Sequence, residues 1–148
     1  MEKTASEQFR KAEELENKGE KKKALGAYKH VVRHWPNSTA AMHAQIRIAE
    51  LYQSLGDPEK AFEAYGKYIS SYPSGQDFER AVEGQYKIAV SFLEGERRKV
   101  FGVKTFSSMQ RAHEMFAEVL KNAPYSRYAA LASYNVGRAL EKQGKLNE

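Results

Sequence analysis

The stretch AFEAYGKYISSYP, residues 61–73, decides the fold of this chain. Ala61, Tyr65 and Tyr68 stand at positions i, i+4 and i+7 and therefore share one face of a helix, which Pro73 ends. The same spacing of a small residue, an aromatic residue, a further apolar residue and a proline occurs twice more: Ala24, Tyr28, Val31 and Pro36, and Ala112, Phe116, Val119 and Pro124. Three copies of one pattern indicate an internal repeat.

Each copy follows another helical segment, in which a small residue stands three positions before a large one. These pairs are Ala12 and Leu15, Ala49 and Tyr52, Ala89 and Phe92, and Gly137 and Leu140. The first two helix pairs align without a gap at a period of 37 residues, whereas the third carries about 11 extra residues in its turn. We therefore predict an all-α superhelical solenoid of antiparallel helix pairs, with about three and a half repeats.

Turn residues mark the ends of these helices. Gly19 and Gly56 are expected just after the first helices of the first two pairs. Asn37 or Ser38 can cap the third helix, and Asp57 with Pro58 is a strong start signal for the fourth.

Composition narrows the classes of function. The chain has 148 residues and a formal net charge of +5. This excess is small and spread out, whereas a nucleic-acid-binding face needs clustered charge, so we expect no nucleic-acid partner. The absence of cysteine excludes disulfides, thiol nucleophiles and cysteine zinc sites within this sequence. We also expect neither a membrane span nor a signal peptide in it, since no long apolar run is present.

The four histidines are the sole candidates for catalysis or metal binding. His30 and His34 stand four residues apart, but no third ligand has a defined spacing, and His43 and His113 are isolated. No nucleophile elbow, phosphate-binding glycine loop or zinc-protease motif occurs. We therefore predict no enzyme, no catalytic residues, no metal and no cofactor.

The repeat resembles the tetratricopeptide repeat in its period, its turn glycine, its Ala-x3-aromatic motif and its closing proline, although Gln8 and Gln45 occupy the consensus tryptophan position. The phrases YPSGQDFERAVEGQYKIA and KTFSSMQRAHEMFAEVLKNAPYSRYA are similar to the BamD-like lipoproteins of outer-membrane β-barrel assembly. The resemblance implies one domain over residues 1–148. Its expected repeats are residues 5–36, 38–73, 77–124 with an insertion at 95–106, and an incomplete 126–148.

The family resemblance also implies a function. It implies a non-enzymatic scaffold at the periplasmic face of the outer membrane, held by a lipid anchor that this sequence does not include. Its partners would be the β-barrel assembly subunit and unfolded outer-membrane proteins. Three alternatives stay open. Two are another periplasmic repeat adapter, such as the Tol-associated protein of cell division, and a generic tetratricopeptide protein-binding module. The third is a nucleic-acid-binding or cytosolic regulatory module that uses the positive charge.

Two surfaces are candidate sites. Stacked first helices would line a concave groove, where aromatic side chains supply apolar area and arginine can bind a carboxylate. The predicted groove residues are Phe9, His43, Ile46, Arg47, Glu50, Tyr86, Tyr134, Asn135 and Arg138. Tyr86 and Tyr134 could instead be core aromatics with a hydrated hydroxyl.

The insertion is the second candidate. Its basic run stands next to apolar residues and could dock a partner; the predicted docking residues are Arg97, Arg98, Lys99 and Phe101. Alternatively, the phenylalanines of this segment cover the ends of the adjacent helices and the charges are solvated.

Overall fold

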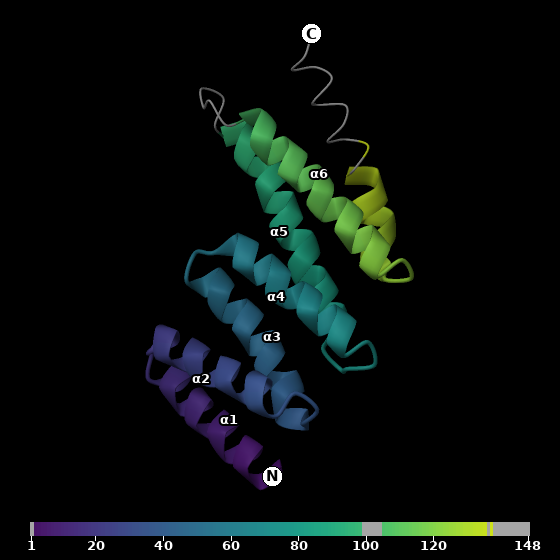
Figure 1. Cartoon of the computed structure of the whole chain (residues 1–148). Helices are drawn as coiled ribbons and strands as arrows, with labels where there is room; N and C mark the ends of the chain where they lie inside the picture. Colours follow the sequence, from purple (N-terminus) through teal and green to yellow (C-terminus); the bar gives the residue numbers. More distant parts are fainter. Residues whose placement is uncertain (1, 99–104, 136, 138–148) are drawn as a thin grey trace. The chain divides into compact units, whose positions relative to one another are not determined.

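The computed structural model describes residues 2–98, 105–135 and 137 (Figure 1). The regular elements within these residues are all helices. They are α1 (Glu2–Asn17), α2 (Lys21–His34), α3 (Thr39–Ser54), α4 (Pro58–Ser71), α5 (Phe78–Arg98) and α6 (Thr105–Asn122), followed by a helix over residues 127–135. The predicted all-α fold of paired helices is confirmed.

The chain divides into two compact units, and the boundary falls inside α5. Unit 1 spans residues 1–81 and unit 2 spans residues 82–148. In unit 1, α1 packs on α2, α2 on α3, and α3 on α4, so each helix lies beside its neighbour in sequence (Figure 1). The single domain over residues 1–148 stays a prediction, as do its repeat boundaries.

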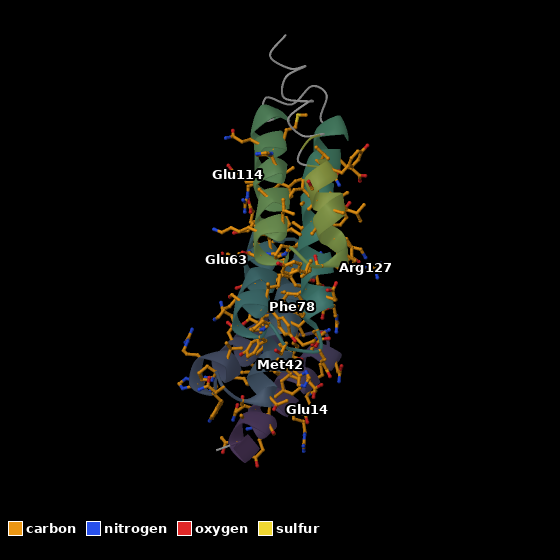
Figure 2. The ribbon with its side chains drawn as sticks, turned by 90° about the vertical axis from the view of Figure 1, so that its right-hand side faces the viewer. Glu14, Met42, Glu63, Phe78, Glu114 and Arg127 are labelled. Carbon is orange, nitrogen blue, oxygen red and sulfur yellow. The ribbon has the colours of Figure 1, made fainter. Side chains whose placement is uncertain are left out.

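The repeat positions form the cores of the two units. The nine residues of the three copies other than the prolines are at most 3% exposed: Ala24, Tyr28, Val31, Ala61, Tyr65, Tyr68, Ala112, Phe116 and Val119. The small residues of the first helices, Ala12, Ala49 and Ala89, are fully buried as well. A side chain of one carbon at these positions lets the paired helices approach closely, and the aromatic residue then fills the space beside it. Figure 2 shows side chains occupying the space between neighbouring helices.

The aromatic residue of the repeat also makes an equivalent polar contact in the first two pairs. The Tyr28 hydroxyl donates a hydrogen bond to Glu16 Oε1 at 2.7 Å, and the Tyr65 hydroxyl donates one to Gln53. Each acceptor stands 12 residues before its tyrosine. A buried tyrosine needs a partner for its hydroxyl, and here the end of the preceding helix supplies it.

The predicted turn signals are confirmed. Gly19 and Gly56 both have φ of +81°, a left-handed conformation that glycine adopts without steric cost. The Ser38 side chain accepts a hydrogen bond from the Ala41 backbone N–H at 3.0 Å, and Asp57 accepts one from Lys60 at 3.1 Å. Of the two candidate caps for α3, Ser38 is therefore the one used.

Part of the segment expected as an insertion is helical. α5 continues through residues 95–98, and α6 begins at Thr105. Glutamate and arginine are good helix formers, so the sequence GERR extends the helix in spite of Gly95. The connection between the two helices falls at residues 99–104, outside the described residues.

Candidate protein-binding face

In unit 1, the first helices of the two pairs, α1 and α3, present a shared surface that we call the first-helix face. Phe9 of α1 lies beside His43 of α3, with ring centroids 6.3 Å apart, and beside Tyr28, at 5.5 Å. Phe9 and His43 are both partly exposed. The structure thus brings two of the predicted groove residues together as an aromatic pair that solvent reaches.

Next to this pair, Arg47 joins α1 to α3. Its Nε donates to Glu16 Oε1 at 3.1 Å, and a second nitrogen of the guanidinium contacts Glu16 Oε2. Its Nη1 donates to Glu50 Oε1 at 2.7 Å. The guanidinium therefore engages two carboxylates of its own chain while 34% of the Arg47 side chain stays exposed.

The ion pairs continue beyond Arg47. Glu50 accepts a hydrogen bond from Arg80 Nε at 3.0 Å, and Arg80 also lies 3.6 Å from Asp77. Burial lowers the pKa of Arg80, but the hydrogen bonds and charges of Glu50 and Asp77 outweigh it and raise that pKa above its ordinary value. We call the series Glu16, Arg47, Glu50, Arg80 and Asp77 the ion-pair ladder.

Sequence reasoning found Arg47 and Glu50 but missed the rest of the ladder. The available signal was spacing, because Glu16 precedes Arg47 by 31 residues and Glu50 precedes Arg80 by 30. Opposite charges separated by nearly one repeat fall on successive first helices and can meet there. Two predicted groove residues, Arg47 and Glu50, therefore pair with each other within the ladder.

Two residues of α3 are packed rather than presented at this face. Ile46 is 2% exposed and belongs to the interior of unit 1. Gln45, at the position of the consensus tryptophan, is also 2% exposed, and its Nε2 donates to the Ala64 carbonyl at 2.9 Å. A buried amide with a backbone partner replaces the apolar contact that a tryptophan would make.

In unit 2, the structure brings Tyr86 and Asn135 together. Asn135 Nδ2 donates to the Tyr86 hydroxyl at 3.0 Å. The Tyr86 ring lies 5.3 Å from that of Tyr128 and 5.8 Å from that of Phe116. Tyr86 therefore acts as a packing residue with a partnered hydroxyl, whereas Tyr134 is 64% exposed.

The remaining predicted site residues lie at the edge of the described residues or outside them. Arg97 and Arg98 lie in the last turn of α5. Lys99, Phe101 and Arg138 lie outside the described residues.

The described residues contain neither a cluster of potential metal ligands nor a helix suited to span a membrane. Within 2–98, 105–135 and 137, no three histidine or acidic side chains gather as metal ligands would. His30 and His34 do meet, with ring centroids 4.1 Å apart, but as an exposed pair beside Trp35. Over the same residues, none of the helices combines the length and apolar character needed to cross a bilayer.

The first-helix face combines aromatic surface with charge. Phe9 and His43 offer exposed ring area, and Arg47 offers a guanidinium held in place by two carboxylates. A peptide can use both features, because its side chain can stack on the rings while its carboxylate competes for the guanidinium.

Comparison with known proteins agrees with the repeat pattern. No curated protein matches the chain. The family model of the YfiO outer membrane lipoproteins matches residues 1–141, which is nearly the whole sequence. The chain therefore belongs to the YfiO family of outer membrane lipoproteins, which includes the BamD-like repeat proteins.

Proposed function

We propose that the chain is a non-enzymatic scaffold of outer-membrane β-barrel protein assembly, working at the periplasmic face of the outer membrane. Membership of an outer membrane lipoprotein family supports this proposal. The fold supports it as well, since stacked helix pairs present extended surfaces to other proteins. The membrane link would be a lipid anchor, and the partners would be the β-barrel assembly subunit and unfolded outer-membrane proteins.

The observation that carries the substrate-binding part is the aromatic pair beside Arg47. Phe9 and His43 lie within ring-contact distance, and the neighbouring guanidinium is held by Glu16 and Glu50. The substrates that the family resemblance implies, unfolded outer-membrane proteins, would offer a C-terminal aromatic residue and a free carboxylate. The aromatic side chain would stack on the pair, and the carboxylate would replace one of the two glutamates on Arg47.

Exchange of one carboxylate for another has a favourable energetic feature. The guanidinium keeps its hydrogen bonds throughout, so binding leaves no uncompensated charge behind. The side chains of Glu16 and Glu50 are 19% and 24% exposed, so water can reach either of them. The displaced glutamate would therefore be hydrated. The ladder would thus hold Arg47 ready for a peptide terminus without a large cost for removing water.

A second surface belongs to the same proposal. The partner subunit would dock through Arg97 and Arg98, in the last turn of α5, and through Lys99 and Phe101, which follow them in the sequence. Their support is the sequence pattern of a cationic run beside an aromatic side chain, which suits an acidic and apolar partner surface.

The substrate proposal is tested with synthetic C-terminal peptides of outer-membrane β-barrels. Labelled peptides with the aromatic terminus, and the same peptides lacking the last residue, are titrated with the protein by fluorescence anisotropy. We expect the intact terminus to bind about tenfold more tightly, because both the ring contact and the correctly placed carboxylate are lost on truncation. Equal affinities would contradict recognition of the terminus.

A pair of matched variants locates the site. His43→Ala removes one ring of the aromatic pair, and His34→Ala removes an exposed ring of α2 that lies outside the first-helix face. His43→Ala is expected to weaken peptide binding several-fold, and His34→Ala is expected to leave it unchanged. Equal effects of the two variants would move the site away from the first-helix face.

A further inference from the structure

A groove lies between the second helices of unit 1, on the far side of α3 from the first-helix face. α3 packs on both α2 and α4, while those two helices have almost no contact with each other. The space left between them is a groove of about 770 Å³. On α3, the groove residues Gln45, Ile48 and Tyr52 lie about half a turn from Arg47 and Glu50, which places the two surfaces on opposite sides of that helix.

The groove has an apolar floor and a basic rim. Val32 and Ile48 form part of the floor and are largely buried, at 8% and 5% exposure. The rim carries four cations, two from each side: Lys29 and Arg33 on α2, and Lys60 and Lys67 on α4. One carboxylate, Glu63 (labelled in Figure 2), lines the groove with them.

Tyr52 connects the two sides of the rim. The Lys29 ammonium lies 5.7 Å from the centre of the Tyr52 ring and donates to its hydroxyl at 3.1 Å. The Lys60 ammonium lies 5.9 Å from the same ring. Two cations are thus gathered around one aromatic ring of the groove lining, where a bound carboxylate would meet both.

The cations of the rim differ from those of the ladder in their partners. Arg47 and Arg80 are both paired with carboxylates of the chain itself. In the part of the chain that the structure describes, Lys29, Arg33 and Lys67 form no salt bridge, and Lys60 has one long contact of 3.9 Å with Asp57. The groove lining therefore carries four cations against the one carboxylate of Glu63, and this excess of positive charge favours an acidic occupant.

We infer that this groove is a docking site for an acidic amphipathic segment of a partner protein. The apolar side of such a segment would cover Val32 and Ile48, and its aspartates or glutamates would meet the cations on both rims. The apolar floor favours a peptide over a nucleic-acid strand, whose phosphates would gain nothing from it. The recessed position between two helices favours a peptide over the flat surface of a membrane.

The occupant would bind independently of a substrate on the first-helix face. The two surfaces use different residues on opposite sides of α3, so one protein could hold a substrate and an acidic partner segment at the same time. This inference does not depend on the substrate proposal, since it requires no aromatic terminus and no contact with Arg47.

The experiment uses a labelled amphipathic helical peptide with leucines at i, i+3, i+4 and i+7 and glutamates on the flanking positions. Its control is the same peptide with every glutamate replaced by glutamine. Anisotropy titrations of the full chain at low salt are expected to show binding of the acidic peptide alone, weakening as salt rises. Absence of binding, or equal binding of the two peptides, would overturn the inference.

Two double variants, which change the net charge of the chain by the same amount, test whether the acidic peptide binds in the groove. Arg33→Glu with Lys67→Glu reverses one cation on each rim, and Lys11→Glu with Lys23→Glu reverses two exposed lysines that do not line the groove. The groove variant is expected to bind the acidic peptide about tenfold more weakly, and the control variant within about twofold of the unchanged chain. Equal losses would show general charge attraction and overturn the inference.

The same variants separate a protein partner from the other anionic partners. Anionic phosphatidylglycerol vesicles and oligouridine RNA are titrated in parallel, and we expect neither to compete with the acidic peptide at physiological salt. Competition by either probe that is lost in the groove variant would assign the groove to a lipid surface or to RNA and overturn the proposed protein partner.

Discussion

Arg47 holds Glu16 with two of its nitrogens and thereby links the first helices of two successive repeats. Residues 31 positions apart meet across the α1–α3 contact. The same Glu16 accepts the hydroxyl hydrogen bond of Tyr28, a buried residue of the second helix α2. One carboxylate therefore connects three helices of unit 1, which makes this contact part of the packing between repeats as well as of the candidate binding face.

Replacement of Arg47 by glutamate should destabilise unit 1. The variant loses the pairs with Glu16 and Glu50 and places a third negative charge beside them. Since the side chains are partly exposed and screened by water, we expect a loss of about 1–2 kcal/mol in the free energy of unfolding. Urea unfolding followed by circular dichroism measures it.

The control for this variant is Arg33→Glu, which makes the same charge change at an exposed arginine of α2 that forms no salt bridge in the described part of the chain. It should stay within about 0.5 kcal/mol of the unchanged protein. If both variants behaved alike, the ladder would add nothing to stability.

Two glycine substitutions should change the free energy of unfolding in opposite directions. Gly26 lies inside α2, and a Cβ added there meets no atom within 4 Å, so Gly26→Ala should stabilise the chain by about 0.5–1 kcal/mol. Gly56 has an equally open surrounding but a φ of +81°, so Gly56→Ala should be destabilising by about 1 kcal/mol. Shifts of the same sign in urea unfolding would contradict this explanation.

The sequence predicted the repeat core because burial there follows periodicity. Residues such as Ala61 and Tyr65 recur at fixed spacing, and that spacing alone fixes which helix face is buried. The helix ends were predictable for a similar reason, since Gly56 and Asp57 act on the backbone next to them.

The candidate site was less predictable. Periodicity assigned Arg47 to the first helix of its pair but did not reveal that Glu16 and Glu50 pair with its guanidinium. The basic groove was missed as well, since Arg33 and Lys67 come from different helices and no local pattern joins them. Such contacts depend on side-chain rotamers and on the packing of whole helices, which a single sequence does not specify.

Ala61→Leu should overpack the α3–α4 contact. Ala61 is fully buried between the helices of the second pair, and three added carbons would force neighbouring side chains or the backbone to move. We expect a loss of about 1–3 kcal/mol in the free energy of unfolding. Ala117→Leu, at an exposed position of α6, is the control and should be nearly neutral; a neutral Ala61→Leu would show that the assumed close approach of the helices is wrong.

The free energy of unfolding should fall at alkaline pH, because the buried Tyr28 resists losing its proton in the folded state. Burial raises the pKa of Tyr28 from 10.0 to about 12, and the charge of Glu13 adds to the shift. The folded state therefore keeps the phenol proton between about pH 10 and 12, where the unfolded chain loses it. The contribution to stability is complete below pH 10 and declines as the pH rises toward 12.

The measurement is the urea midpoint at several pH values from 8 to about 11, compared with that of Tyr28→Phe. The variant has no phenol at this position, so its midpoint should decline less steeply above pH 10, even if it is less stable at pH 8 through loss of the hydrogen bond to Glu16. Tyr68, whose pKa is also raised by burial, remains in both proteins, so a residual slope is expected in the variant. Parallel slopes for the two proteins would show that Tyr28 ionises as readily in the folded state as in the unfolded chain.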